Sequence, residues 1–135
     1  MRPQSIVNFE RLLLLLIVLG LVGTVLDWER TVALAARQGL GSGVVVAITV
    51  VSVAIYALLL WLIARRRSLV AVWIYVALVV IGLLYLLMNT GELMRQSTPM
   101  LLLQAVQCLL SLVSIWLLFR PDSRAWFQGD ARPAA

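Results

Sequence analysis

The residues best suited to do chemistry form a row of polar side chains inside the last long apolar segment of the chain. They recur at intervals of three and four, which places them on one face of a helix. The row consists of Gln104, Gln107, Cys108, Ser111 and Ser114. Amides, hydroxyls and a thiol in this arrangement can line a hydrated path or a substrate pocket. They can also form hydrogen bonds that hold neighbouring helices together.

A second polar set at helical spacing lies in an earlier apolar segment and consists of Thr49, Ser52 and Tyr56. Hydrocarbon cannot satisfy hydrogen-bonding groups, so the row in the last segment must face protein. The second set is suitably spaced to face that row from a neighbouring helix. We favour a role for both sets in joining helices over a role in a pocket, because a four-helix bundle leaves little interior room.

One pair of charged residues lies close to the lipid-facing part of the chain. Glu10 and Arg11 stand near the beginning of the first apolar run. A carboxylate buried in a membrane helix can bind a proton or an organic cation. Here the headgroup region is only a few residues away, and Arg11 and Arg2 are close enough to compensate the negative charge. We therefore predict a structural charge pair at the membrane interface and not a coupling site.

Small residues in the first apolar run permit close approach of another helix. Gly20 and Thr24 form a small-xxx-small pair, and Gly23 lies beside them. This pattern predicts helix packing, either within one chain or between two copies of it.

No set of residues matches a catalytic, metal-binding or cofactor-binding pattern. The chain has no histidine and a single cysteine, Cys108, so neither a disulfide within the chain nor a Cys/His metal site can form. The carboxylates Asp27 and Glu29 stand in one polar segment and Glu92 in another. The glycine-rich segment 39–43 lacks the lysine and the strand-to-helix context of a phosphate-binding loop. We predict a protein that is not an enzyme and has no cofactor.

The composition shows which solvent surrounds these residues. Hydrophobic residues make up 63% of the chain and charged residues 13%, whereas soluble domains have about 45–50% and about 25%. The mean hydropathy is +1.03. A water-soluble fold of this size has too few charges to cover so much apolar surface. Lipid must therefore be the solvent for most of the chain.

Four apolar runs have the length of a transmembrane helix, and they cover residues 6–26, 44–64, 69–88 and 100–119. About 20 residues at 1.5 Å per residue cross a hydrocarbon layer of about 30 Å. The runs are continuous and do not alternate, which excludes the strands of a membrane barrel. The sequence predicts one all-α domain, a four-helix transmembrane bundle.

Three segments outside the runs have their own expected structure. We expect a short interfacial helix around residues 31–38 and an antiparallel hairpin across the connection 65–68. The tail 120–135 is expected to be amphipathic at first and disordered at its end. Within it, Asp122 or Ser123 is suited to cap a helix, and Trp126 with Phe127 is suited to lie among lipid headgroups.

All eleven basic residues are arginine, and they are distributed unevenly. Eight lie on the side that carries both ends of the chain: Arg2, Arg11, Arg65, Arg66, Arg67, Arg120, Arg124 and Arg132. Three lie on the other side: Arg30, Arg37 and Arg95. Because an arginine excess marks the cytoplasmic side, we predict that both ends are cytoplasmic. The same role explains the net charge of +5 without a nucleic-acid partner.

Two segments carry a resemblance to known proteins. The sequences RPQSIVNFERL, at residues 2–12, and RPDSRAWF, at residues 120–127, resemble those of a group of uncharacterised small four-helix membrane proteins of the bacterial inner membrane. The resemblance implies that membrane and implies no activity.

These observations favour a structural or accessory protein that is surrounded by membrane lipids and associates with itself or with a larger membrane complex. The lean polar segments and the absence of charges within the last three runs support this interpretation. The alternative is a small oligomeric transporter, channel or lipid-translocating protein that uses the row in the last apolar segment.

Overall fold

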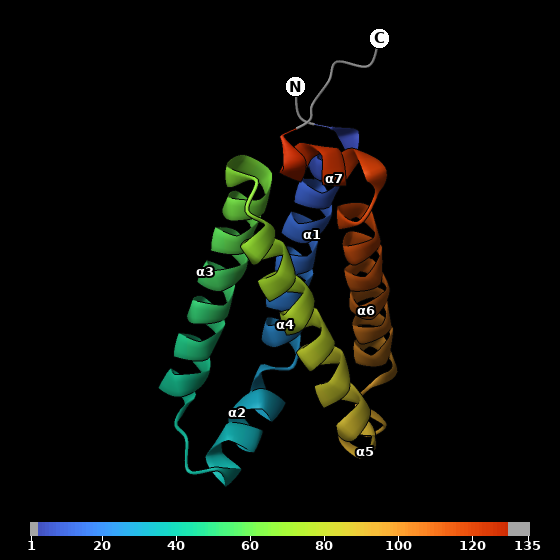
Figure 1. Ribbon diagram of the computed structural model, residues 1–135. Helices are drawn as coiled ribbons and strands as arrows, with labels where there is room; N and C mark the ends of the chain where they lie inside the picture. Colours follow the sequence, from blue (N-terminus) through green and yellow to red (C-terminus); the bar gives the residue numbers. More distant parts are fainter. Residues whose placement is uncertain (1–2, 130–135) are drawn as a thin grey trace.

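The computed structural model describes residues 3–129, which fold into helices without any strand. Four helices are long and apolar enough to cross a membrane: α1 (Gln4–Leu26), α3 (Ser42–Arg66), α4 (Leu69–Met88) and α6 (Thr98–Leu118) (Figure 1). The predicted all-α fold with four spans is thereby confirmed, and the chain is a multi-pass membrane protein.

The spanning helices differ from the apolar runs mainly at their ends. α4 has the predicted bounds, whereas α1 and α6 each begin two residues before the apolar run and α3 extends beyond its run at both ends. The reason is that helical hydrogen bonding continues into polar residues such as Gln4 and Ser42. Hydropathy marks where lipid begins and not where a helix begins.

Three short helices connect or extend the bundle: α2 (Trp28–Arg37), α5 (Thr90–Leu93) and α7 (Pro121–Gln128). α2 occupies the segment expected to form an interfacial helix, but it begins earlier. In α7 the expected cap is wrong, because the helix already begins at Pro121, after Arg120. Proline has no N–H to leave unsatisfied and is favoured in the first turn of a helix.

A tight connection makes α3 and α4 an antiparallel pair. Arg67 ends α3 in the left-handed conformation, with φ of 52°. Ser68 then caps α4 by accepting a hydrogen bond from the N–H of Ala71, at 3.2 Å. The two helices therefore meet at this connection and diverge away from it (Figure 1).

The two ends of the bundle differ in charge. One end, uppermost in Figure 1, holds α7, the start of α1 and the connection between α3 and α4; we call it the arginine-rich end. Six described arginines lie at or near it: Arg11, Arg65, Arg66, Arg67, Arg120 and Arg124. The opposite end, called the loop end, holds α2, α5, Arg30, Arg37 and Arg95. Arg2 and Arg132, which the sequence assigns to the arginine-rich side, lie outside the described residues.

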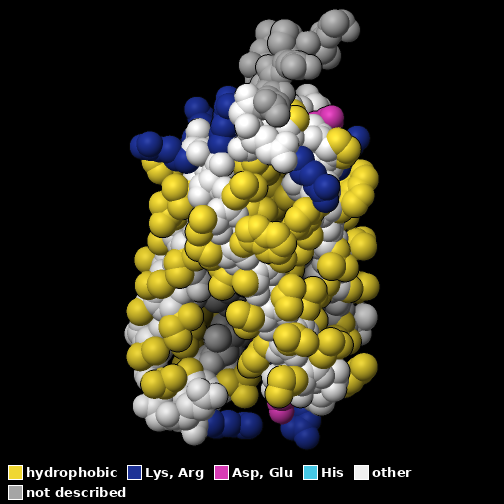
Figure 2. All heavy atoms as spheres, viewed as in Figure 1, with side chains coloured by type: hydrophobic (Ala, Val, Ile, Leu, Met, Phe, Trp, Pro, Cys, Tyr) yellow, Lys and Arg dark blue, Asp and Glu magenta, His cyan; other side chains and the backbone are white. Residues whose placement is uncertain are grey.

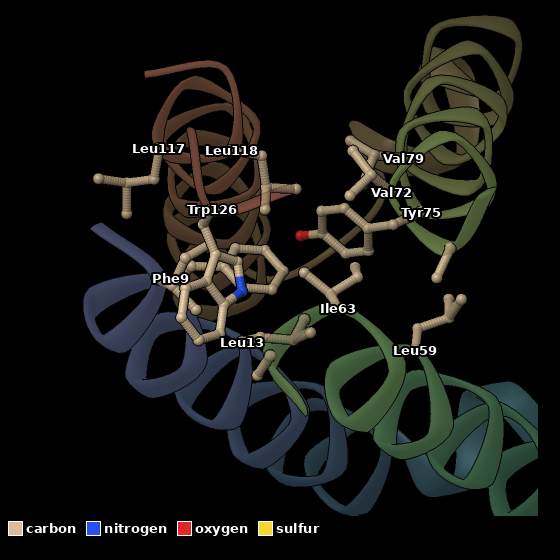
Figure 3. Packing of buried hydrophobic residues seen from close by; sticks show 13 residues of the cluster. Phe9, Leu13, Leu59, Ile63, Val72, Tyr75, Val79, Leu117, Leu118 and Trp126 are labelled. Carbon is tan, nitrogen blue, oxygen red and sulfur yellow. The ribbon is translucent and has the colours of Figure 1, made fainter. Parts of the chain in front are cut away.

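The buried core lies at the arginine-rich end. Phe9, Ile63, Tyr75 and Trp126 come together there from α1, α3, α4 and α7 (Figure 3). The rings of Phe9 and Tyr75 meet edge to face, with 5.5 Å between their centroids. The buried residues of α4 end at Val79, and none lies in the turns that follow it up to Met88. The bundle is therefore closely packed at one end and open at the other.

α7 closes the packed end. The hydroxyl oxygen of Ser123 lies 2.7 Å from the carbonyl oxygen of Leu117 and 2.9 Å from the hydroxyl oxygen of Ser5. A hydroxyl has one proton, so both contacts are satisfied when Ser5 donates to Ser123 and Ser123 donates to Leu117. These contacts turn α7 back across the end of the bundle.

This turn corrects the expected position of Trp126. Instead of lying among headgroups, Trp126 is only 7% exposed and belongs to the core. The guanidinium of Arg67 lies over its ring, 3.9 Å from the centroid. The predicted disordered end of the tail, residues 130–135, lies outside the described residues.

We predict that Phe9→Ala lowers the free energy of unfolding by about 2 kcal/mol, because lipid is as apolar as the core and only the cost of the cavity remains. Leu14→Ala is the matched control, since Leu14 lies on the same helix and is 49% exposed. Unfolding in mixed detergent micelles measures both. Equal losses in the two variants would contradict a core at this end of the bundle.

Candidate functional site

A cavity of about 370 Å³ lies between the four spanning helices, and every one of them contributes to its wall. We call it the central cavity. It extends along α1 from Leu13, next to the core, to Thr24 near the loop end. Figure 2 shows the surface of the bundle hollowed in its lower half. The volume falls within the range of about 300–1,000 Å³ that is typical of ligand-binding pockets.

The cavity brings the two predicted polar sets together. Thr49, Ser52 and Tyr56 line it from α3, and the row in α6 lines it from the other side. The residues of that row in the wall are Gln104, Gln107, Cys108 and Ser111. All of the predicted polar residues except Ser114 therefore share one space.

Ser114 instead joins two helices beside the cavity. Its side-chain oxygen lies 2.6 Å from the carbonyl oxygen of Ser111 and 2.6 Å from the hydroxyl oxygen of Tyr75. Ser114 has one proton, which it donates to the carbonyl, so Tyr75 donates to Ser114. Figure 3 shows Tyr75 extending from α4 with its hydroxyl directed toward α6. This contact is an interhelical hydrogen bond of the kind that the sequence analysis favoured for the whole row.

Aromatic rings close the cavity toward the core. Tyr56 and Tyr75 both line the cavity, and their rings meet edge to face with centroids 6.4 Å apart. Phe9 packs against the other side of Tyr75. The cavity therefore ends at a packed aromatic layer and does not continue to the arginine-rich end.

The remaining polar groups bond mainly within their own helices. Thr49 donates to the carbonyl oxygen of Val45 at 2.9 Å, and Ser111 donates to that of Gln107 at 2.8 Å. Both hydroxyl oxygens keep lone pairs that can accept a hydrogen bond. No charged side chain lines the central cavity within residues 3–129. The cavity is thus apolar, with uncharged hydrogen-bonding groups on two opposite walls.

The interior space is larger than we expected from the sequence. The expectation that a four-helix bundle has little interior room is wrong here. α3 and α4 diverge from their short connection, and small residues line the space that opens between the helices. At Gly20 and Gly82, for example, a Cβ atom would have no neighbouring atom within 4 Å.

A second, more polar cavity of about 220 Å³ lies at the loop end, and we call it the vestibule. It is bordered by α1, by the start of α2, by the connection before α6 and by α6 itself. The residues that line it are Gly20, Gly23, Thr24, Asp27, Thr31, Gln96, Met100, Leu103, Gln104 and Gln107. Gly20, Thr24, Gln104 and Gln107 border both cavities, so the vestibule adjoins the central cavity.

An ion pair connects the polar segments around the vestibule. Arg30 of α2 donates to Glu92 of α5, at 2.8 Å to the carbonyl oxygen and 3.1 Å to the carboxylate. Arg95 lies 3.5 Å from the other carboxylate oxygen. The sequence did not predict the contact of Arg30 with Glu92, because the two residues are 62 positions apart. Nor did it predict that Asp27, Thr31 and Gln96 are neighbours, because they come from separate segments of the chain.

The remaining predicted residues lie at different places. Glu10 is half-buried and Arg11 is exposed, and neither lines the two cavities. Gly23 stands where α1 approaches α6, since a Cβ atom there would lie 3.2 Å from Leu103. Gly20 and Thr24 border the cavities, and Thr24 donates to the carbonyl oxygen of Gly20 at 3.0 Å. No group of three or more histidine, cysteine or acidic residues suited to a metal occurs in the described part of the chain.

Comparisons with protein-family models, with curated proteins and with solved structures found no match to this chain.

We predict that Cys108 reacts with neutral, water-soluble methyl methanethiosulfonate when the protein is embedded in lipid nanodiscs. The thiolate that reacts forms only where water reaches the sulfur, and Cys108 lines the central cavity. Ser52→Phe should slow the reaction because it fills the same space, whereas Ser42→Phe, at the exposed start of α3, should not. Mass spectrometry counts the modified chains. A thiol that reacts only with lipid-soluble maleimide would indicate a dry helix contact.

Proposed function

We propose that this chain is a non-enzymatic membrane protein that binds a small amphiphile in the central cavity and handles it between the membrane interior and the loop end. The observation that supports this proposal is a cavity that all four spanning helices surround, with uncharged polar groups on opposite walls. This choice reverses the preference drawn from the sequence and takes up its transport or lipid-handling alternative.

The pattern of hydrogen bonds supports a binding role for Thr49 and Ser111. Side chains that only join helices pair across the helix interface, as Tyr75 does with Ser114. Thr49 and Ser111 instead bond to carbonyl groups of their own helices. Their oxygens remain able to accept from a guest molecule, while the apolar wall around them suits an alkyl chain.

The absence of charge in the wall indicates which part of a ligand belongs there. Transfer of an ionised group from water to an apolar site is strongly unfavourable unless a partner charge compensates it. The described wall of the central cavity offers no such partner. An apolar chain with at most neutral polar atoms therefore suits this space, and a charged head does not.

The distribution of arginines supports an orientation. Under the positive-inside rule the arginine-rich end faces the cytoplasm, so both chain ends are cytoplasmic and the vestibule opens on the outer side. With the resemblance of residues 2–12 and 120–127, this gives a location in the bacterial inner membrane. Lipids are the expected surroundings and nucleic acid is not a partner.

We predict that native mass spectrometry of protein released gently from its own membranes finds a reproducible small-molecule mass, which Gly20→Leu removes. Gly20 borders both cavities, and open space lies where its side chain would begin. Gly43→Leu is the matched control, because Gly43 also lies in a helix next to open space but lines neither cavity. A mass that persists in Gly20→Leu would place the ligand elsewhere.

An accessory role remains the second candidate, and one observation favours it. The outer halves of α3 and α4 diverge (Figure 1) and leave apolar side chains such as Ile48 and Ile81 largely exposed. A helix of a second copy or of a larger membrane complex would pack against them. A stoichiometric second chain, found without any small-molecule mass, would support this role and count against ligand binding.

A substitution at Gln107 separates the two candidates. We predict that Gln107→Leu weakens ligand retention while the free energy of unfolding changes by less than about 0.5 kcal/mol, since its side-chain amide has no hydrogen-bond partner within residues 3–129. If the amide joins helices or chains, stability or assembly should fall instead. Detergent unfolding and native mass spectrometry of the same preparation measure both quantities.

A further inference from the structure

We propose that the vestibule recognises a primary ammonium group, so that the ligand is an amphiphile with a protonated amine at one end of an apolar chain. This inference rests on the proposed function and adds the chemistry of the headgroup. Three features of the vestibule support this headgroup: its charge, its acceptor groups and its position along α1.

The charge of the vestibule is negative. Asp27 is the one charged side chain that lines either cavity within the described residues. The nearest cation along the chain, Arg30, is held by Glu92 at 2.8 and 3.1 Å. Because this arginine already has a carboxylate partner, the carboxylate of Asp27 is left to attract a positively charged ligand group. A phosphate or carboxylate head would be repelled from the same place.

The vestibule contains amide groups, which both donate and accept, and hydroxyl groups that can only accept. Thr24 and Thr31 donate their single hydroxyl protons to the carbonyl oxygens of Gly20 and Asp27, at 3.0 and 2.9 Å. Their oxygens can therefore only accept from a ligand. The side-chain oxygen of Gln96 is buried and has no hydrogen-bond partner among the described residues. A primary ammonium group has three N–H donors and a positive charge, which matches this set.

The position of the vestibule fits a headgroup. Asp27 directly follows Leu26, the last residue of the spanning helix α1, and so lies where the hydrocarbon layer ends. Leu13 and Thr24 mark the extent of the central cavity along α1, about 16 Å apart at the helical rise per residue. Since Gly20 and Gln104 border both cavities, one molecule can place its head in the vestibule and a single alkyl chain in the central cavity.

Three probes with the same alkyl chain separate charge from hydrogen bonding. Dodecylamine is protonated at pH 7, as is a lysine side chain with a pKa of about 10.4, and it carries both charge and donors. Dodecyltrimethylammonium carries charge without donors, and dodecanol carries one donor without charge. Each is titrated into nanodiscs that contain the full chain, and occupancy is measured as protection of Cys108 from neutral methyl methanethiosulfonate.

We expect dodecylamine to give half-protection at a concentration about tenfold below that of the other two probes, as for hydrogen bonds to a charged group. In Asp27→Asn, the concentration of dodecylamine that gives half-protection should rise to the value found for dodecanol. Glu29→Gln is the matched control, because it removes an exposed carboxylate of α2 that lies outside the vestibule, and it should change nothing. Gln96→Leu should bring the half-protection concentrations of dodecylamine and dodecyltrimethylammonium closer together.

The outcomes distinguish this inference from the proposed function. If no probe protects Cys108, the proposed function itself fails. If all three protect equally, or if dodecylamine keeps its advantage in Asp27→Asn, ligand binding stands and ammonium recognition is wrong. If Glu29→Gln reduces the advantage of dodecylamine as much as Asp27→Asn does, the preference comes from general surface charge, and ammonium recognition by the vestibule is wrong. Protection by dodecanol should be the same in every variant, which verifies that the variants are folded.

Discussion

The hydrogen bond between Tyr75 and Ser114 connects α4 to α6. In lipid, apolar side chains gain no free energy by moving from the solvent into the protein core. Lipid tails are as apolar as leucine, so a membrane bundle is held by close packing and by polar contacts between helices. On one side of this bond lie the aromatic contacts of Phe9 and the docked helix α7. On its other side the helices diverge and the central cavity begins. This contact therefore lies at the boundary between the closed and the open part of the bundle.

From that boundary the chemistry changes stepwise along the bundle. The arginine-rich end is packed and capped by α7, the middle is apolar with neutral polar groups, and the vestibule at the loop end is polar, with Asp27 as the one charged residue in its described wall. Each step follows from the cost of charge in lipid: ionised groups stay at the ends, and uncharged hydrogen-bonding groups are tolerated in the middle where they face a shared space. A molecule with an apolar part and a cationic part matches this order, with its apolar part in the central cavity and its cationic part in the vestibule.

The sequence predicted the spans and the two polar faces, because apolar length and a spacing of three and four residues depend only on local geometry. It did not show whether the two polar faces contact each other directly or line a cavity between them. Spacing fixes the face of a helix, whereas the divergence of α3 and α4 is an arrangement in space that spacing does not show (Figure 1). The vestibule could not be predicted from the sequence, because its surroundings come from distant segments. Arg30 and Glu92 are 62 positions apart, and Gln96 lies in an irregular turn. Trp126 was misplaced because a tryptophan beside basic residues is typical of an interface, while its burial follows from the distant contact of Ser123 with Ser5.

That last contact also bears on the order of biosynthesis. Ser5 and Ser123 are 118 positions apart, so they can meet only after the whole chain has been synthesised and the final span has been inserted. Until then the first three spans lack both the helix that completes the aromatic core and the partner of Tyr75. Insertion of the individual helices and closure of the bundle are consequently separate events, as in two-stage folding of membrane proteins. A chain truncated before α7 would keep its spans in the bilayer and yet lack the element that seals them together.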